Sequence, residues 1–287
     1  MNKNRLILMA ILWMLPFICV AASEKTYDGV TIMSYNIRCD SGKHKDGTNS
    51  WEFRWKSVIN MIDACGADVI GLQEVTPFQL PLLKDYCEKY RFKGVGRDDG
   101  KKKGEQTAIM YRADKVALVK WGAFWLSETP DKPGKGWDAA CPRVTTWAIF
   151  RSKKSGERFM VVNTHLDHKG AQAQANGLKL IMDKIQEINK KAYPVVLMGD
   201  LNIKPDSPAF ASMEGHSFQD ARLCADKTDS CASFHGWGKR ALVIDYIFAK
   251  GFSAIPMFRT VNEKYNDEAG EPHFVSDHNP IISCLIF

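Results

Sequence analysis

Short apolar segments of strand type recur along almost the whole chain, and they restrict the fold more than any other feature of the sequence. Each is rich in β-branched or aromatic residues, and several are bounded by Gly, Pro or Asp, which is the pattern of buried strands. They span residues 31–37, 69–72, 107–111, 116–126, 144–150, 159–162, 194–198, 243–248 and 281–287. The sequence therefore predicts a core built on β-sheet.

Amphipathic segments between these strands predict helices. One precedes Gly66, a second follows Pro77, and the third carries apolar residues at helical spacing over 178–188 with charges on the opposite side. Asp206 or Ser207 can cap a short helix that has Pro208 in its first turn. No Gly/Ser-rich or Pro-rich linker divides the chain, so we expect one α/β domain over residues 25–287.

The first 22 residues have the layout of a secretory signal peptide. Lys3 and Arg5 precede an apolar stretch over 6–20, and Ala21-Ala22-Ser23 follows it. The stretch is shorter than the roughly 20 residues of a transmembrane helix, so a membrane anchor is the weaker interpretation. We expect cleavage near Ala22 and an exported protein, periplasmic or secreted. Without Lys3 and Arg5 the 39 basic residues become 37 against 33 acidic ones, a net charge of +4. That charge permits a phosphate-bearing substrate without demanding nucleic acid.

Export makes disulfides possible for the seven cysteines that follow the signal peptide. Cys224 and Cys231 are the best candidate pair, because they lie close together in a polar, loop-like stretch. No Cys/His spacing in the sequence matches a zinc site.

Polar side chains follow the apolar segments repeatedly. An acid or an amide after one strand is usually a turn former or a helix cap. Strand ends on one edge of a sheet converge, however, so seven such ends can build one site. That site would be rich in oxygen and poor in thiolate, which suits Mg²⁺, or Mn²⁺ in its place, better than zinc. The residues are Asn36, Glu74, Tyr111, His165, Asp200, Asn202, Asp245, Asp277 and His278.

The chain resembles the endonuclease/exonuclease/phosphatase superfamily, the DNase I-like metal-dependent phosphoesterases. The resemblance rests on motifs in the family's order, which together are highly specific: SYNIR (34–38), GLQEV (71–75), TAIMYR (107–112), NTHLDH (163–168), GDLN (199–202), IDYIF (244–248) and SDHNP (276–280). It implies a four-layer αββα sandwich, in which two packed, mostly antiparallel sheets are flanked by helices.

The resemblance also implies roles for matching residues. Glu74 is the main metal ligand, with Asn36 beside it. Asp200 and Asn202 orient and deprotonate the attacking water. His278 contacts the scissile phosphate, Asp277 fixes the tautomer of His278, and His165 stabilises the transition state. Tyr111 and Asp245 support the phosphate and the base side of the site. For Asp277 a turn-stabilising carboxylate is a serious alternative.

Three further residues are candidates for binding substrate phosphate. Arg38 stands where some family members carry an acid, and it either contacts phosphate or forms an ion pair. Arg143 precedes a strand and either clamps phosphate with its forked guanidinium or forms a surface salt bridge. His235 lies in an aromatic stretch that either stacks on substrate or packs as a loop cluster.

These observations favour an exported Mg²⁺-dependent phosphodiesterase of nuclease type, an exonuclease in particular, acting on nucleic acid or nucleotides. A sphingomyelinase-like enzyme or an inositol or sugar phosphate phosphoesterase, acting on a phospholipid headgroup or a sugar phosphate, is the alternative. An inactive binding protein of the same fold is disfavoured, because the candidate catalytic side chains are retained. No stable protein partner is implied, and we expect a monomer.

Overall fold

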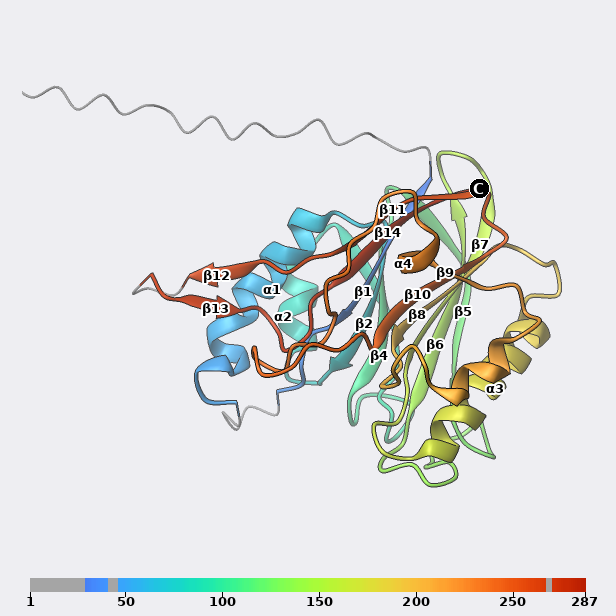
Figure 1. Ribbon diagram of the computed structural model, residues 1–287, viewed down its shortest axis with the longest axis horizontal. Helices are drawn as coiled ribbons and strands as arrows, with labels where there is room; N and C mark the ends of the chain where they lie inside the picture. Colours follow the sequence, from blue (N-terminus) through green and yellow to red (C-terminus); the bar gives the residue numbers. More distant parts are fainter. Residues whose placement is uncertain (1–28, 41–45, 267–269) are drawn as a thin grey trace, which may run out of the picture.

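The structure, a computed structural model, describes residues 29–40, 46–266 and 270–287, and two six-stranded sheets packed face to face form its centre (Figure 1). The predicted signal peptide lies outside the described residues. The first sheet has the strand order β11 (Ala254–Thr260), β14 (Ile281–Ile286), β1 (Val30–Asn36), β2 (Val69–Val75), β4 (Gln106–Arg112), β3 (Tyr90–Lys93). The second has the order β5 (Val116–Trp125), β6 (Val144–Ser152), β7 (Arg158–His165), β8 (Val195–Asp200), β10 (Asp245–Lys250), β9 (Gln219–Asp220).

Most neighbouring strands are antiparallel. The exceptions within the two sheets are the parallel pairs β1/β2 and β7/β8. A separate hairpin pairs β12 (Lys264–Asn266) with β13 (Pro272–Phe274). The predicted sandwich of two mostly antiparallel sheets is confirmed, and each of the nine predicted strand segments corresponds to a strand.

Helices cover the outer faces of the sheets (Figure 1). The helices α1 (Trp51–Cys65) and α2 (Leu80–Tyr86) pack on the first sheet, and α3 (Ala171–Ile188) with the 3-10 segment η2 (Pro208–Met213) packs on the second. Shorter segments are η1 (Gly47–Asn49) and α4 (Ala221–Cys224). Ser207 caps η2 by accepting a hydrogen bond from the backbone N–H of Ala209 (3.3 Å). No helix in the described ranges is long and apolar enough to cross a membrane.

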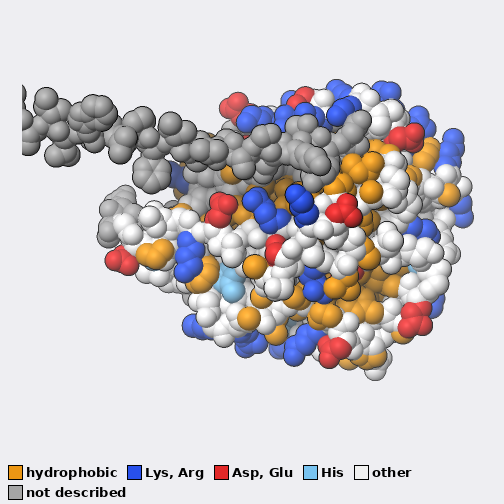
Figure 2. Space-filling model, turned by 45° about the horizontal axis from the view of Figure 1, so that its top comes forward, with side chains coloured by type: hydrophobic (Ala, Val, Ile, Leu, Met, Phe, Trp, Pro, Cys, Tyr) orange, Lys and Arg blue, Asp and Glu red, His pale blue; other side chains and the backbone are white. Residues whose placement is uncertain are grey.

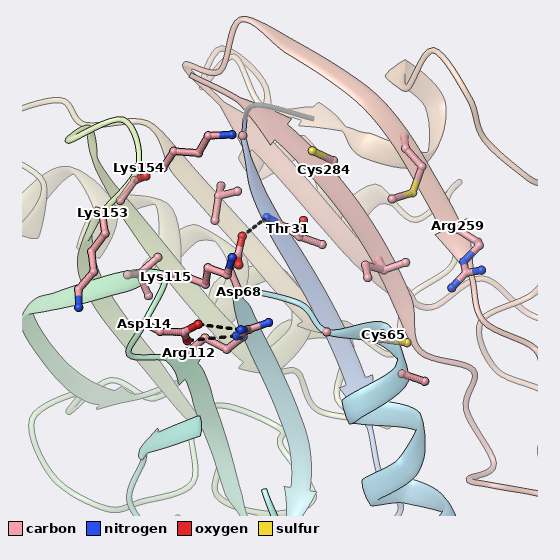
Figure 3. Close-up of a pocket in the computed structure, with 18 of the residues that line it drawn as sticks. Thr31, Cys65, Asp68, Arg112, Asp114, Lys115, Lys153, Lys154, Arg259 and Cys284 are labelled. Carbon is pink, nitrogen blue, oxygen red and sulfur yellow. Dashed lines mark hydrogen bonds and ion pairs between the residues drawn. The ribbon is translucent and has the colours of Figure 1, made fainter. Parts of the chain in front are cut away.

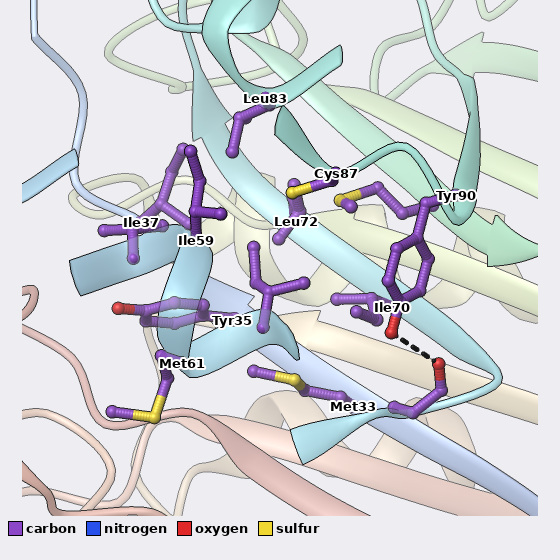
Figure 4. Packing of buried hydrophobic residues seen from close by; sticks show 14 of the residues in the cluster. Met33, Tyr35, Ile37, Ile59, Met61, Ile70, Leu72, Leu83, Cys87 and Tyr90 are labelled. Carbon is purple, nitrogen blue, oxygen red and sulfur yellow. Dashed lines mark hydrogen bonds between the residues drawn. The ribbon is translucent and has the colours of Figure 1, made fainter. Parts of the chain in front are cut away.

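Three apolar clusters follow from this layering. One fills the space between the sheets and includes Phe150, Phe159 and Ile247. A second lies between the first sheet and its helices, where Tyr35 and Ile70 meet residues of α1 (Figure 4). The third lies under α3. Strands that are covered on both faces are buried at nearly every position, as in β8, and this explains their continuous apolar runs in the sequence.

The predicted Cys224–Cys231 disulfide is absent. Cys224 is exposed, Cys231 is half-buried, and both are free thiols, like the other described cysteines.

Candidate active site

Strands of both sheets bring their polar ends together at one edge of the sandwich. Pairing fixes this arrangement: Asp200 lies opposite His165 in the parallel pair β7/β8 and opposite Asp245 in the antiparallel pair β8/β10. Asn36 ends β1 and faces Gln73 of β2. The structure thus brings together most of the predicted site residues: Asn36, Glu74, His165, Asp200, Asn202, Asp245 and His278.

The Asp200 carboxylate lies at the centre of this group. Its Oδ2 atom accepts a hydrogen bond from Asn36 Nδ2 (3.0 Å), and it lies 3.5 Å from His165 Nε2 and 3.6 Å from His278 Nε2. Burial, followed by repulsion from Asp245, raises the pKa of Asp200 to about 7. A carboxylate that titrates near neutral pH is suited to take a proton from water.

Asp245, rather than Asp277, orients the His278 ring. His278 Nδ1 lies 2.8 Å from Asp245 Oδ2. The side chains of Asp245, Asp277 and His278 are all buried. Burial acts to lower the pKa of His278, but attraction to Asp245 and Asp200 outweighs it and raises this pKa to about 10. The prediction that Asp277 fixes the tautomer is therefore wrong: its carboxylate lies 3.9 Å from Arg38 Nε.

Glu74 reaches the site from a distorted part of β2. The register between β2 and β4 shifts between Leu72 and Val75, and Glu74 has φ 63°, in the left-handed region. Its carboxylate accepts hydrogen bonds from Asn36 Nδ2 (3.0 Å) and the backbone N–H of Cys39 (2.8 Å). Burial acts to raise the pKa of Glu74, but these donors and the charge of Arg38 lower it below its usual value, so the side chain is an anion.

Asn202 and His165 complete the group around Asp200. The backbone N–H of Asn202 donates to Asp200 Oδ1 (2.9 Å), and Asn202 Nδ2 donates to the carbonyl of Leu166 (3.1 Å). Burial and the nearby Arg143 lower the pKa of His165 well below its usual value, so this ring is neutral.

Tyr111 does not reach the site. Strand β4 runs antiparallel to β2, so Tyr111 pairs with Val69 at the far end, while Gln106 pairs with Val75 beside Glu74. Tyr111 packs against Phe150 between the sheets, with ring centroids 5.1 Å apart. The polar residue at the carboxyl end of an antiparallel strand points to the other edge, and the prediction did not allow for this.

Two of the predicted phosphate-binding residues make contacts within the protein. Arg38 forms a two-point ion pair with Asp46, with N–O distances of 2.9 Å. The His235 ring stacks on Phe274 with centroids 4.2 Å apart, and His235 Nδ1 accepts a hydrogen bond from the Gly238 N–H (3.2 Å). Of the alternatives that the sequence left open, the contacts of Arg38 match the ion pair and those of His235 match the loop cluster.

Arg143 is buried beside the site, so the surface salt-bridge interpretation is wrong for this residue. Arg143 Nη2 donates to His168 Nδ1 (3.0 Å), and Nε lies 3.6 Å from Asp167 Oδ2. Asp167 is itself fixed by the backbone N–H groups of Ala140, Lys169 and Gly170. Burial opposes these donors, which nevertheless lower the pKa of Asp167 to about 2.

Sequence reasoning missed two residues at the site, Arg97 and Glu105. They line a small pocket together with Glu74, His165 and Arg143. The only signal for them was the charged, glycine-containing stretch over 94–105, which resembles any solvated loop.

A buried amide pair also joins the two sheets next to the site. Gln73 Nε2 of β2 donates to Asn163 Oδ1 of β7 (2.7 Å), and Asn163 Nδ2 donates to the carbonyls of Leu72 and Ala108 (3.0 and 2.8 Å). These contacts fix one sheet against the other where their polar ends meet.

The donors at this edge fit a divalent cation. Asp200 and Asp245 offer carboxylate oxygens in a buried cluster with His278, whose polar atoms lie within 4.8 Å of one another. Asp245 Oδ1 is buried without a hydrogen-bond partner, and the Glu74 carboxylate lies one hydrogen bond away through Asn36. A set dominated by carboxylate oxygens is typical of Mg²⁺ and Mn²⁺ sites.

A much larger groove, of about 1020 Å³, lies away from this cluster (Figure 3). Thr31, Asp68 and Arg112 line it, and none of the residues around Asp200 does. Its walls include the ends of β1, β2 and β4 that are opposite to the site, so it belongs to another part of the surface.

Comparisons with known proteins identify the family of the chain. A model of the Endonuclease/Exonuclease/phosphatase family matches residues 33–278. A family protein from Bacteroides thetaiotaomicron is 32% identical, with a TM-score of 0.85 over 90% of this chain and 98% of that one. A mannosyl-6-phosphatase from Bacteroides thetaiotaomicron VPI-5482 is 33% identical, with a TM-score of 0.84 over 90% of this chain and 100% of that one.

A more distant relative is the CCR4-Not complex 3'-5'-exoribonuclease subunit Ccr4 from Neosartorya fischeri. It is 27% identical over 179 residues, which are 51% of this chain. The match spans only 23% of the length of that protein.

Proposed function

Since the chain belongs to the endonuclease/exonuclease/phosphatase family of phosphate-ester hydrolases, we propose that it is a Mg²⁺-dependent phosphatase that removes the phosphoryl group from a phosphorylated sugar. The observation that carries the proposal is the likeness to a mannosyl-6-phosphatase along the whole of that chain, at 33% identity. The match to the exoribonuclease covers a small part of that protein and supports a nuclease less well.

Each side chain of the cluster has a task in this reaction. Asp200 accepts a proton from the attacking water, whose oxygen forms the new bond to phosphorus. The ester bond breaks, and the alcohol departs with a proton from the solvent. His278, cationic and held by Asp245, donates a hydrogen bond to the phosphoryl oxygens as their charge grows, with the neutral His165 beside it. Asn202 holds Asp200 in place.

Enzymes of this family typically depend on a divalent metal ion. Glu74 and Asn36, with Asp200 and Asp245 nearby, are the residues that would hold it. When bound, it neutralises phosphate charge and helps the ester oxygen to leave.

A panel of substrates tests the proposal. The purified protein is assayed with Mg²⁺ or Mn²⁺ on sugar phosphates, RNA, DNA, sphingomyelin and bis-p-nitrophenyl phosphate. We expect release of orthophosphate from a hexose phosphate at the highest kcat/KM. Asp200→Ala and His278→Ala should each lower kcat by more than about 10²-fold without loss of fold.

An exonuclease is the second candidate, and the exoribonuclease relative favours it. On the face shown in Figure 2, Lys and Arg side chains are spread out rather than gathered in one groove. Faster degradation of RNA than of any sugar phosphate would replace the phosphatase proposal by this one.

We also propose that the protein acts outside the cytoplasm. The basic, apolar and small-residue order of residues 1–22 supports this. The mass of the mature N-terminus tests it, with cleavage near Ala22 as the expected result.

A further inference from the structure

The loop over residues 94–105, between β3 and β4, is a structured hairpin at the edge of the site. The backbone N–H of Arg97 donates to the carbonyl of Glu105 (3.0 Å), and Asp99 Oδ1 accepts from the N–H of Lys103 (2.9 Å). Gly96 allows a close crossing, since a Cβ there would lie 2.2 Å from the carbonyl oxygen of Lys103. Because its own hydrogen bonds fix the loop, the side chains at its base have defined positions.

The side chains at the base of this loop are Arg97 and Glu105. Arg97 Nη1 and Glu105 Oε2 are 2.7 Å apart, and the carbonyl of Arg97 accepts a hydrogen bond from the Trp125 indole (2.7 Å). Both lie on the wall of the pocket that also contains His165 and Glu74. Glu105 therefore holds the Arg97 guanidinium beside the proposed reacting centre.

Arg143 forms another part of the same wall. His168 and Asp167 hold its guanidinium, as described above. The Nε atoms of Arg97 and Arg143 are both buried and have no hydrogen-bond partner. Buried donors without acceptors are rare and costly in folded proteins. Carboxylates lie near both Nε atoms, Asp98 Oδ1 at 3.9 Å and Asp167 Oδ2 at 3.6 Å, but neither makes a hydrogen bond with them. Each guanidinium group on the wall of this pocket therefore keeps one N–H donor that makes no hydrogen bond within the protein.

We propose that Arg97 and Arg143 form a two-arginine clamp for the terminal phosphoryl group of a phosphomonoester, with Glu105 as a positioning residue. The proposal rests on the proposed function and names the residues that would bind the phosphoryl group and favour a monoester over a diester. Guanidinium groups match phosphate oxygens geometrically. A monoester offers three terminal oxygens and two negative charges, whereas a diester offers two oxygens and one charge.

Binding of inorganic phosphate tests the clamp without turnover. Orthophosphate is titrated into the full chain in the presence of Mg²⁺, and the Kd is measured by calorimetry. Arg97→Met and Arg143→Met should each weaken binding by about tenfold or more, since each removes a charged, forked donor. The control is Arg112→Met, because Arg112 forms an equally short ion pair, 2.7 Å from Asp114, at the opposite end of β4. Arg112→Met should bind phosphate like the wild type.

Ester preference gives a second readout. Arg97→Met should lower kcat/KM for p-nitrophenyl phosphate by about tenfold and that for bis-p-nitrophenyl phosphate by about threefold or less. If Arg143→Met fails to fold, Arg143→Lys takes its place, because it keeps the positive charge. Arg143→Lys should still weaken phosphate binding, because lysine lacks the forked pair of donors.

The clamp is wrong if the wild type does not bind orthophosphate, if both clamp variants bind it like Arg112→Met, or if both esters lose rate equally. These results are separate from failure of the proposed function. The proposed function fails if the wild type hydrolyses no sugar phosphate. In that case the titration with orthophosphate still decides whether the clamp exists.

Discussion

The position of the His278 ring depends on a contact between residues that are 33 positions apart in the chain. Asp277 is next to His278 in sequence, but neighbouring side chains diverge. In the structure the His278 ring contacts Asp245 instead. The sequence motifs identify both acids as important without showing which one faces the imidazole. Pairing of Asp245 with Asp200 across β10 and β8 decides this.

Asp245→Asn should therefore lower kcat by roughly 10²–10⁴-fold, because the histidine loses the negative charge that stabilises its cationic form. Asp277→Asn is the matched comparison, and we expect a clearly smaller loss. Steady-state kinetics at pH 7.5, with circular dichroism as the check on folding, measures both. Equal losses in the two variants would return Asp277 to the role that the sequence motifs implied.

His235 should make stability depend on pH. Burial, and then repulsion from His278 and Lys264, lower the pKa of His235 to about 4. In the unfolded chain His235 binds its proton near pH 6.5. The contribution of His235 to the free energy of unfolding is therefore fully present above pH 6.5 and is lost as the pH falls toward 4. Between pH 7.5 and pH 5 the contribution is about 2 kcal/mol.

His235→Phe removes the titrating ring and can still stack on Phe274. Urea unfolding at both pH values should show a smaller fall in the free energy of unfolding for this variant than for the wild type. An identical fall would mean that His235 is protonated equally easily in the folded and the unfolded protein.

At the scale of elements, the sequence predicts the central strands of the two six-stranded sheets well but misses three of their four edge strands, β11, β3 and β9, and finds only β5. A strand such as β8, buried at all six positions, has an apolar run that is unmistakable. The missed strand β11 contains Pro256 and Arg259, and the missed β3 has two basic residues in four positions. Both are edge strands, which have an open side and so tolerate Pro and charge.

The site follows the same logic. Residues at the ends of buried strands, such as Asn36 and Asp200, were predictable from the strand pattern. Arg97 and Glu105 were not, because only the fold of the loop over 94–105 brings them to His165. The prediction for Tyr111 was wrong because a local motif does not show whether its strand runs parallel or antiparallel to its neighbour.

Gly71 lies where the two sheets approach each other closely. A Cβ there would lie 2.6 Å from Asn163 Oδ1 and 2.7 Å from Met198 Cε. Gly71→Ala should therefore destabilise the protein by about 1–3 kcal/mol through overpacking. Gly134→Ala is the control, because a Cβ at Gly134 would meet no atom within 4 Å. Chemical unfolding of the two variants measures the difference, and equal stabilities would show that the sheets adjust freely.

At the scale of the whole molecule, the site exists only where the two sheets meet. Asn36 and Glu74 come from the first sheet, and His165, Asp200 and Asp245 come from the second. Three carboxylates at such an edge repel one another, and a bound cation relieves this repulsion.

Mg²⁺ should thus raise the melting temperature as well as support turnover. At a concentration of about 100 times its Kd we expect a rise of about 5 °C, which EDTA reverses. Glu74→Gln should lose most of the rise, whereas Glu157→Gln, at an exposed position, should keep it. A full rise in Glu74→Gln would place the ion elsewhere in the protein.

The strand β14 lies between β11 and β1, inside the first sheet, although it follows every other described strand along the chain. His278 stands three residues before its start. A growing chain on the ribosome therefore lacks a histidine of the site until residue 278 has been added, and an inner strand of one sheet until residue 286 has been added. Hydrolytic activity should therefore arise only when nearly the whole chain has been made, and incomplete chains on the ribosome would leave surrounding phosphate esters untouched.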